Sequence, residues 1–242
     1  MNRKSTKINA FTLAEVLITL GVIGVVAAVT MPMLINKYRE RQFISGLQKS
    51  ISTMENAYKL AYYENGESDD FGYKVAEYVP LPPEQGDGVY NKNGSYDSDK
   101  FFQALSQYLN IAKDCGMNGE KDGCFPETIY SPFSENTWNL VTMQGYSRRF
   151  FILNDGTSIG VTGGGNTYID VNGLKGPNTL GIDVFQVGLK NGRVTYFDDG
   201  GTDGTVKCYT SQFACSSWVI RNLNMDYLHC KDLNWKTKTK CN

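Results

Sequence analysis

The chain has 242 residues, a net charge of −1 at pH 7 and a single histidine, His229. This charge balance offers no basic surface of the kind that nucleic acid requires. No Ser-His-Asp set, HExxH, P-loop or GxSxG motif is present, which argues against an enzyme. Residues 65–242 are numerous enough to form one globular domain with a sizeable core.

The first feature along the chain is an apolar segment at residues 11–35, which carries one charge, Glu15. A segment of this length can cross a bilayer as a helix. A lone carboxylate inside it costs about 2 to 3 kcal/mol on insertion scales, so it usually marks a function. The simpler interpretation is that Glu15 reaches out to water at the head groups. The segment is too long for the apolar core of a signal peptide. Basic residues lie on both flanks and leave the orientation open: Arg3, Lys4, Lys7, Lys37, Arg39 and Arg41.

The stretch KINAFTLAEVLITLGVIGVVAAVTMPML resembles the N-terminus of type IV prepilins and of the pseudopilins of type II secretion systems. These proteins have a short basic leader, a small residue before the cleavage point, then Phe-Thr-Leu and a Glu four residues after the Phe. The resemblance implies a leader peptide at residues 1–10 and cleavage between Ala10 and Phe11. It also accounts for Pro32. The family usually has Gly where this chain has Ala10.

The resemblance implies partners and a location as well. A prepilin peptidase would remove the leader and methylate the new amine of Phe11, and Glu15 would pair with that amine on a neighbouring subunit. Residues four apart share one face of a helix, which agrees with a matched pair at these two positions. The other partners would be copies of this chain or homologous pilin subunits, and the assembly platform of a type II secretion or type IV pilus system. The chain would cross the bacterial inner membrane once, with its N-terminus cytoplasmic and its C-terminal domain extracytoplasmic.

Beyond the apolar segment we expect the helix to continue, with a kink near Thr30 to Pro32. Apolar residues recur there at spacings of three and four, which indicates a helix that packs on a core. They are Ile44, Leu47, Ile51, Met54, Tyr58 and Ala61. Asn65-Gly66 is a good end signal. The predicted organisation is a transmembrane half at residues 11–35, an amphipathic half at 36–64 and a globular domain at 65–242.

The remaining elements alternate between helix and strand patterns. Residues 64–72 and 79–97 are predicted to be surface loops. A second helix is expected at 98–112, and a short one within 215–228 that starts near Ser216. Strand patterns predict a hairpin at 148–162 with its turn at 154–156, a strand at 167–171, and a hairpin at 182–197 with its turn at Asn191-Gly192. The predicted fold class is α+β. The resemblance implies a pilin-like arrangement, with the long N-terminal helix packed on a small antiparallel sheet and with extra helices and loops.

Six cysteines lie between residues 115 and 241, and an even number beyond a membrane anchor favours disulfides in an oxidising compartment. Metal binding would favour close CxxC pairs, which are absent from the sequence. Fifteen pairings are open in principle. Proximity in the sequence favours Cys115 with Cys124, Cys208 with Cys215, and Cys230 with Cys241.

Two acidic, glycine-rich stretches are candidate cation sites. DVNGLKGPNTLGID contains Asp170, Asn172, Asn178 and Asp183 and is distantly similar to the calcium loop of major pseudopilins. Closely spaced oxygen ligands on a turning backbone suit Ca²⁺, the one cofactor that the sequence suggests. The second stretch is DDGGTDG, with Asp198, Asp199 and Asp203. Plain Asn-Gly and Asp-Gly turns are the commoner explanation of both.

The sequence therefore favours a structural subunit, a pilin or pseudopilin, that is cleaved and polymerises into a filament. Two alternatives stay open. One is a membrane-anchored extracytoplasmic binding or adhesion protein that uses aromatic loops. The other is an anchored hydrolase with paired carboxylates, since Asp and Glu are plentiful.

Overall fold

The computed structural model describes residues 12–66, 78–80, 89–91, 98–117, 119, 121–135, 137–138, 148–162, 166–190, 192–196 and 204–241. The chain divides into two units, residues 1–41 and residues 42–242. Residues 42–65 therefore belong to the same compact unit as the rest of the globular domain. Helix side chains just before residue 65 contribute to the core of that unit, and the predicted domain boundaries stay a prediction.

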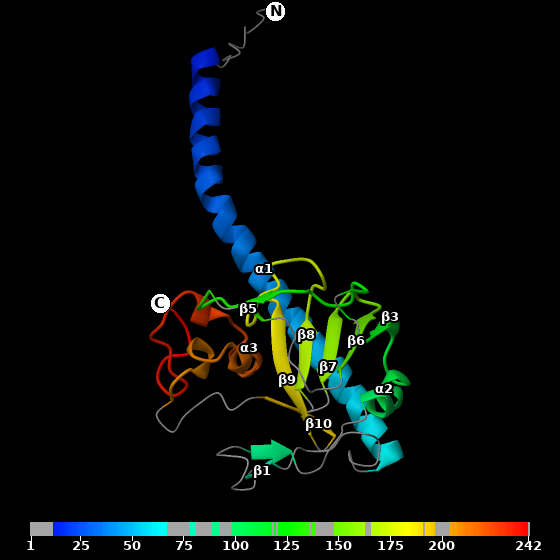
Figure 1. Cartoon of the computed structure of the whole chain (residues 1–242). Coiled ribbons are helices and arrows are strands. Elements are labelled where there is room, and N and C mark those ends of the chain that lie inside the picture. The colour runs from blue at the N-terminus through cyan, green and yellow to red at the C-terminus, as the bar shows by residue number, and fades with distance from the viewer. Residues whose placement is uncertain are drawn as a thin grey trace, which may run out of the picture. The chain divides into compact units, whose positions relative to one another are not determined.

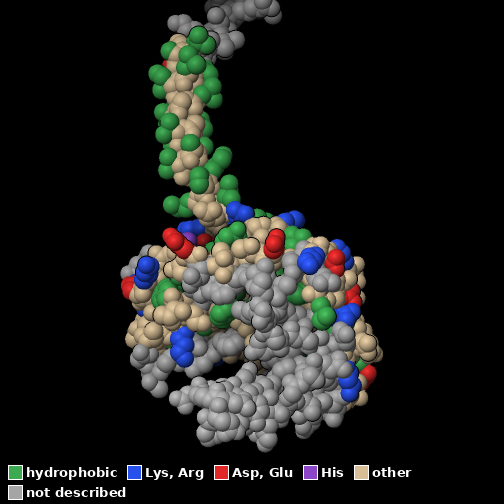
Figure 2. All heavy atoms as spheres, viewed as in Figure 1, with side chains coloured by type: hydrophobic (Ala, Val, Ile, Leu, Met, Phe, Trp, Pro, Cys, Tyr) green, Lys and Arg blue, Asp and Glu red, His purple; other side chains and the backbone are tan. Residues whose placement is uncertain are grey.

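Helix α1 spans Leu13–Asn65 and continues through Pro32. Its N-terminal segment is long and apolar enough to cross a membrane, with a mean hydropathy of 2.3 and none of its side chains buried. Figure 2 shows apolar side chains over the visible face of this segment. Pro32 has no backbone N–H, so one helix hydrogen bond is missing at that point. The bend expected near Thr30 to Pro32 stays a prediction.

The C-terminal part of α1 carries the apolar stripe, and the predicted period is confirmed. Its buried residues are Phe43, Leu47, Ser50, Ile51, Met54, Ala57, Tyr58 and Ala61. Small residues on this face allow a close approach: a Cβ added at Gly46 would stand 3.1 Å from the Cβ of Val171. The Lys49 ammonium also lies 2.8 Å from the Asp155 carboxylate, at the turn of a hairpin in the sheet.

The stripe packs on a six-stranded sheet in which every pair of neighbours is antiparallel (Figure 1). The strand order is β10 (Arg193–Thr195), β9 (Val184–Lys190), β8 (Asn166–Asp170), β7 (Ser158–Thr162), β6 (Arg148–Leu153) and β3 (Ile111–Gly116). Both predicted hairpins and the strand between them are confirmed. The sheet is larger than predicted because β3 adds to it. Asn191 lies outside the described residues.

Side chains alternate between two cores, one on each face of the sheet. Phe151, Ile169 and Phe185 face the core that contains the stripe of α1. Their neighbours Phe150, Tyr168 and Val184 face a second, smaller core, which includes the Cys115–Cys124 disulfide and Phe125. The sheet therefore forms a central layer that is covered on both sides.

Helix α2 covers Ser98–Ser106 and helix α3 covers Cys215–Asn222. Two further two-stranded sheets pair β1 (Tyr78–Pro80) with β2 (Val89–Asn91), and β4 (Ile129–Tyr130) with β5 (Thr137–Trp138). Three short 3₁₀ helices lie at Lys207–Tyr209, Gln212–Ala214 and Asp226–Leu228.

Three predicted elements need correction. The helix predicted at 98–112 stops at Ser106, because Ile111 pairs with Leu153 as the first residue of β3. The loop predicted at 79–97 contains strand residues of β1 and β2. The helix predicted within 215–228 ends at Asn222, because Leu223 adopts a left-handed conformation with φ of 53° and its N–H donates to the Val219 carbonyl.

Candidate functional site

The start of α1 forms a local hydrogen-bonded cap that involves Glu15. The Thr12 N–H donates to Glu15 Oε2 at 2.8 Å, and the Glu15 N–H donates to Thr12 Oγ1 at 3.2 Å. This reciprocal pattern is a capping box, with Thr12 as the N-cap and Glu15 three residues later. The T-x-x-E spacing in TLAE is the sequence signal of this cap, and the expectations above did not include it. Glu15 thus has a local role within its own chain.

The capping box occupies only part of the bonding capacity of Glu15. Both contacts of the carboxylate, from the Thr12 N–H and the Thr12 hydroxyl, fall on Oε2. A carboxylate has two oxygens that can each accept further hydrogen bonds. Ala10 and Phe11, the predicted cleavage residues, lie outside the described residues, so their relation to Glu15 stays a prediction.

The predicted calcium residues come together in the loop between β8 and β9. Asp170 is the last residue of β8 and lies opposite Val184, the first residue of β9. Asp183 holds the loop closed: its Oδ1 accepts the Thr179 N–H at 2.7 Å and its Oδ2 accepts the Asn178 N–H at 2.9 Å. The Asp183 carboxylate thus stabilises the turn of the loop, as expected if the stretch is a plain Asn-Gly and Asp-Gly turn.

Asp170 is less well accounted for. Its Oδ1 accepts the Asn172 N–H at 3.2 Å, as in an Asx turn. Its Oδ2 is buried and has no hydrogen-bond partner among the described residues, and the same holds for the Oδ1 atoms of Asn172 and Asn178. Buried polar atoms normally have a partner, so three unpartnered oxygens in one loop call for an explanation.

The electrostatics of the loop also indicate that its carboxylates lack a cationic partner among the described residues. Both Asp170 and Asp183 have no exposed surface. Desolvation and the nearby charge of Asp183 raise the pKa of Asp170 to about 9. Desolvation also raises the pKa of Asp183, although its backbone hydrogen bonds oppose the shift. Two carboxyl groups in a dry loop are therefore costly to ionise without a cation.

The loop fits Ca²⁺ in the chemistry of its donors, because carboxylate and amide oxygens are the ligands that this ion prefers. Asp170, Asn172, Asn178 and Asp183 would hold it. Among the residues that the structure describes, no three His, Cys, Asp or Glu side chains form a metal cluster, so this site depends on amide oxygens for half of its side-chain donors. Asp198, Asp199 and Asp203 lie outside the described residues.

Three disulfides close short loops, and they join the pairs that proximity favours. Cys115–Cys124 fastens the loop after β3 to the smaller core. Cys208–Cys215 links a 3₁₀ helix to the start of α3. Cys230–Cys241 ties the last described residues to the rest of the domain. The described part of the chain contains no free cysteine.

No protein-family profile, no curated protein and no solved structure matches this chain. The fold and these local sites are therefore the basis of the functional argument. They define an α+β protein with an antiparallel sheet, three disulfides and, in the part of the chain that the structure describes, one N-terminal helix capable of crossing a membrane.

Proposed function

We propose that this chain is a structural subunit of the type IV pilin and pseudopilin class, which is cleaved after Ala10 and then polymerises through its N-terminal helix. The observation that carries the proposal is the segment AFTLAE, which follows a basic leader and opens an apolar helix. The architecture supports it: a long helix starts in an apolar segment and ends as one layer against an antiparallel sheet.

The proposal gives Glu15 two roles in sequence. In the free subunit the carboxylate caps its own helix through Thr12. In the filament it also accepts the cationic amine of a neighbouring Phe11, in a low dielectric where attraction between opposite charges is strong. Such a pair stabilises one axial offset between neighbouring helices. The apolar contacts of residues Leu17 to Val29 cannot select an offset, because they are similar at many offsets. Fixing a register is the best-attested use of buried charge.

The β8–β9 loop has a structural role in this proposal. Ca²⁺ bound by Asp170 and Asp183 would neutralise two buried carboxylates and hold the loop on the sheet. The ion supplies charge neutralisation and a fixed set of oxygen contacts, and no reaction is involved. The loop lies against the hairpin turn that precedes β7, since a Cβ added at Gly173 would stand 2.7 Å from the Gly156 carbonyl oxygen. A loop ordered by Ca²⁺ would therefore also stiffen the neighbouring hairpin turn.

The alternative functions differ from this one in what they need from the N-terminus. An anchored binding protein or hydrolase needs the apolar helix only as an anchor, and its leader can stay in place. A filament subunit needs both cleavage after Ala10 and an acid at Glu15. Processing therefore separates the classes before any ligand is known.

Intact mass spectrometry of protein extracted from its native membrane tests the proposal. We expect a chain that begins at Phe11 and is one methyl group heavier than its sequence mass. An Ala10→Gly variant, which has the residue usual in the family, serves as a positive control for cleavage. A mature chain that begins at Met1, or beyond Thr30, would remove the filament proposal and leave the anchored alternatives.

A further inference from the structure

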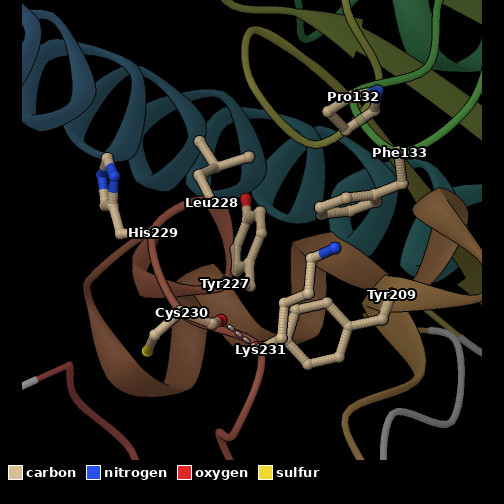
Figure 3. Close-up of a pocket in the computed structure, with 8 residues that line it drawn as sticks. All are labelled: Pro132, Phe133, Tyr209, Tyr227, Leu228, His229, Cys230 and Lys231. Carbon is tan, nitrogen blue, oxygen red and sulfur yellow. Dashed lines mark hydrogen bonds between the residues drawn. The ribbon is translucent and has the colours of Figure 1, made fainter.

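A pocket of about 550 Å³ lies on the globular unit (Figure 3), and its residue Tyr227 contacts the β8–β9 loop at the Gly181 carbonyl. Phe133, from the segment after β4, forms one wall, and Tyr209 and Tyr227, from two 3₁₀ helices, form others. The volume lies within the usual range of small-ligand sites, about 300 to 1,000 Å³. Neither the filament proposal nor the calcium loop gives this pocket a role.

The pocket is positively charged. Among the described residues that line it, Lys231 is the only lysine, arginine or acidic one. In Figure 3 the Lys231 ammonium extends over the rings toward Phe133 and Pro132. The nearest acids in the sequence are engaged elsewhere: Asp232 pairs with Lys238 at 2.5 Å, and Asp226 Oδ2 accepts the Cys241 N–H at 2.6 Å. Within the described residues the Lys231 ammonium has no hydrogen bond or ion pair.

The segment that supplies most of the lining is also more basic than the rest of the globular unit. Residues 204–242 contain six Lys and Arg against two Asp and Glu, whereas residues 42–203 contain twelve against twenty-one. A locally basic segment in an otherwise acidic unit attracts anions to its own surface. The pocket therefore selects for a ligand that carries negative charge.

The aromatic walls restrict the ligand further. The Phe133 ring stands edge-on to Tyr209, with centroids 5.8 Å apart, and to Tyr227, with centroids 6.5 Å apart. The tyrosine hydroxyl hydrogens are already used, because Tyr209 donates to the Cys230 carbonyl and Tyr227 donates to the Gly181 carbonyl, each at 2.5 Å. The walls thus offer ring surface and acceptor oxygen, and the ammonium of Lys231 supplies the charged donor.

The pocket is open to water on one side, since Lys231 is exposed while Phe133 and Tyr209 are half-buried. A fitting ligand needs an apolar face for the rings, an anionic group for Lys231 and polar groups that stay hydrated. A sugar ring has a C–H face and a hydroxyl rim, and a uronic acid adds a carboxylate. We propose that this pocket binds the uronate residues of an acidic polysaccharide, with Lys231 on the carboxylate and Phe133 and Tyr209 against the ring.

Saturation-transfer NMR on the full chain in detergent micelles tests this proposal, with a galacturonic acid trisaccharide as the probe. We expect transfer to the sugar C–H protons that weakens as salt is added. Lys231→Ala should weaken binding at least about tenfold, as expected for loss of a charged hydrogen bond. Phe133→Leu keeps an apolar side chain but removes the ring, and should weaken transfer. Lys240→Ala removes the same charge from the same segment outside the pocket and should bind like the parent.

Three results would overturn the proposal. Equal transfer to a neutral galactose trisaccharide would show that charge does not select the ligand. Unchanged binding by Lys231→Ala would place the site elsewhere. Transfer to phenylacetate but not to the uronate would show that the pocket takes an aromatic acid and not a sugar.

Discussion

Replacing Asp170 with Asn should stabilise the protein at pH 7 when calcium is absent. Burial in the loop raises the pKa of Asp170 from 3.8 to about 9. The folded state therefore holds a proton that the unfolded state releases, so the contribution of Asp170 to stability is greatest below pH 4 and falls as the pH rises toward 9. Between pH 3.8 and pH 7 the loss amounts to about 4 kcal/mol, at about 1.4 kcal/mol per pH unit. Asn has no charge to desolvate and keeps one oxygen for the Asn172 N–H.

The assay is urea unfolding of the full chain in detergent, followed by the fluorescence of Trp218, which is fully buried. In EGTA at pH 7 we expect Asp170→Asn to exceed the parent by about 2 to 4 kcal/mol, because water that enters the loop lowers the full cost. Near pH 4 the difference should vanish. In calcium the difference in stability between variant and parent should shrink or change sign. Calcium at a hundred times its Kd stabilises the parent by about 2.7 kcal/mol, whereas the variant lacks a ligand.

Asp155→Asn is the matched control and should behave in the opposite way. Partial desolvation acts to raise the pKa of Asp155, but hydrogen bonds from Lys49 and Thr157 outweigh it and hold the pKa below its ordinary value. This group contributes stability above pH 4 that is lost as the pH falls, so the variant should be the weaker protein at pH 7. If Asp170→Asn is no more stable than the parent in EGTA, the reasoning is refuted. If calcium stabilises Asp170→Asn and the parent equally, Asp170 is not a ligand.

Two further predictions concern the core and the disulfides. Gly160→Ala should cost about 1 to 3 kcal/mol in urea unfolding, because the new Cβ would stand 2.8 Å from the Phe150 ring, which is itself buried against Phe125. Gly24→Ala, with nothing within 4 Å of the new Cβ, should not destabilise the protein, because Ala is the better helix former. Non-reducing peptide mapping of protein from its native cell should find the three short-range disulfides, and Cys215→Ser should cost about 2 to 3 kcal/mol. Six alkylatable thiols in that protein would contradict the assignment.

The elements that the sequence predicted well are those with a regular pattern over many residues. The stripe from Leu47 to Ala61 matched its period because one helix face fills one core. The hairpin turns were marked by Asp155-Gly156 and Gly192, where φ is +88° and +70°. These signals are local, so a single sequence contains them.

The errors arose where long-range pairing overrides a local pattern. Ala112 continues the apolar spacing of α2, yet it lies in β3, where Ile111 pairs with Leu153 of β6, some forty residues further along the chain. The segments around Val79 and Val89 contain prolines and glycines typical of loops, yet they pair with one another. No local pattern shows a partner at that distance, so these strands could not be predicted from propensity.

The candidate sites divide in the same way. The oxygen-rich residues of the β8–β9 loop were visible because they lie close together in the sequence. The burial of Asp170, which makes the loop more than a turn, depends on the strands on either side of it. The pocket around Lys231 combines residues 132–133 with residues 209–231, and no sequence motif joins them.

Filament incorporation of two Glu15 variants separates an assembly contact of this carboxylate from a helix cap. Gln at this position can still complete the capping box but carries no charge, whereas Ala loses both the cap and the charge. Each variant is expressed with its native assembly machinery, and sheared filaments are compared with the membrane pool. The account predicts that both variants are cleaved and inserted, and that Glu15→Gln is depleted from filaments as strongly as Glu15→Ala. Normal incorporation of Glu15→Gln beside a defective Glu15→Ala would contradict it, because the carboxylate would then serve only as a helix cap.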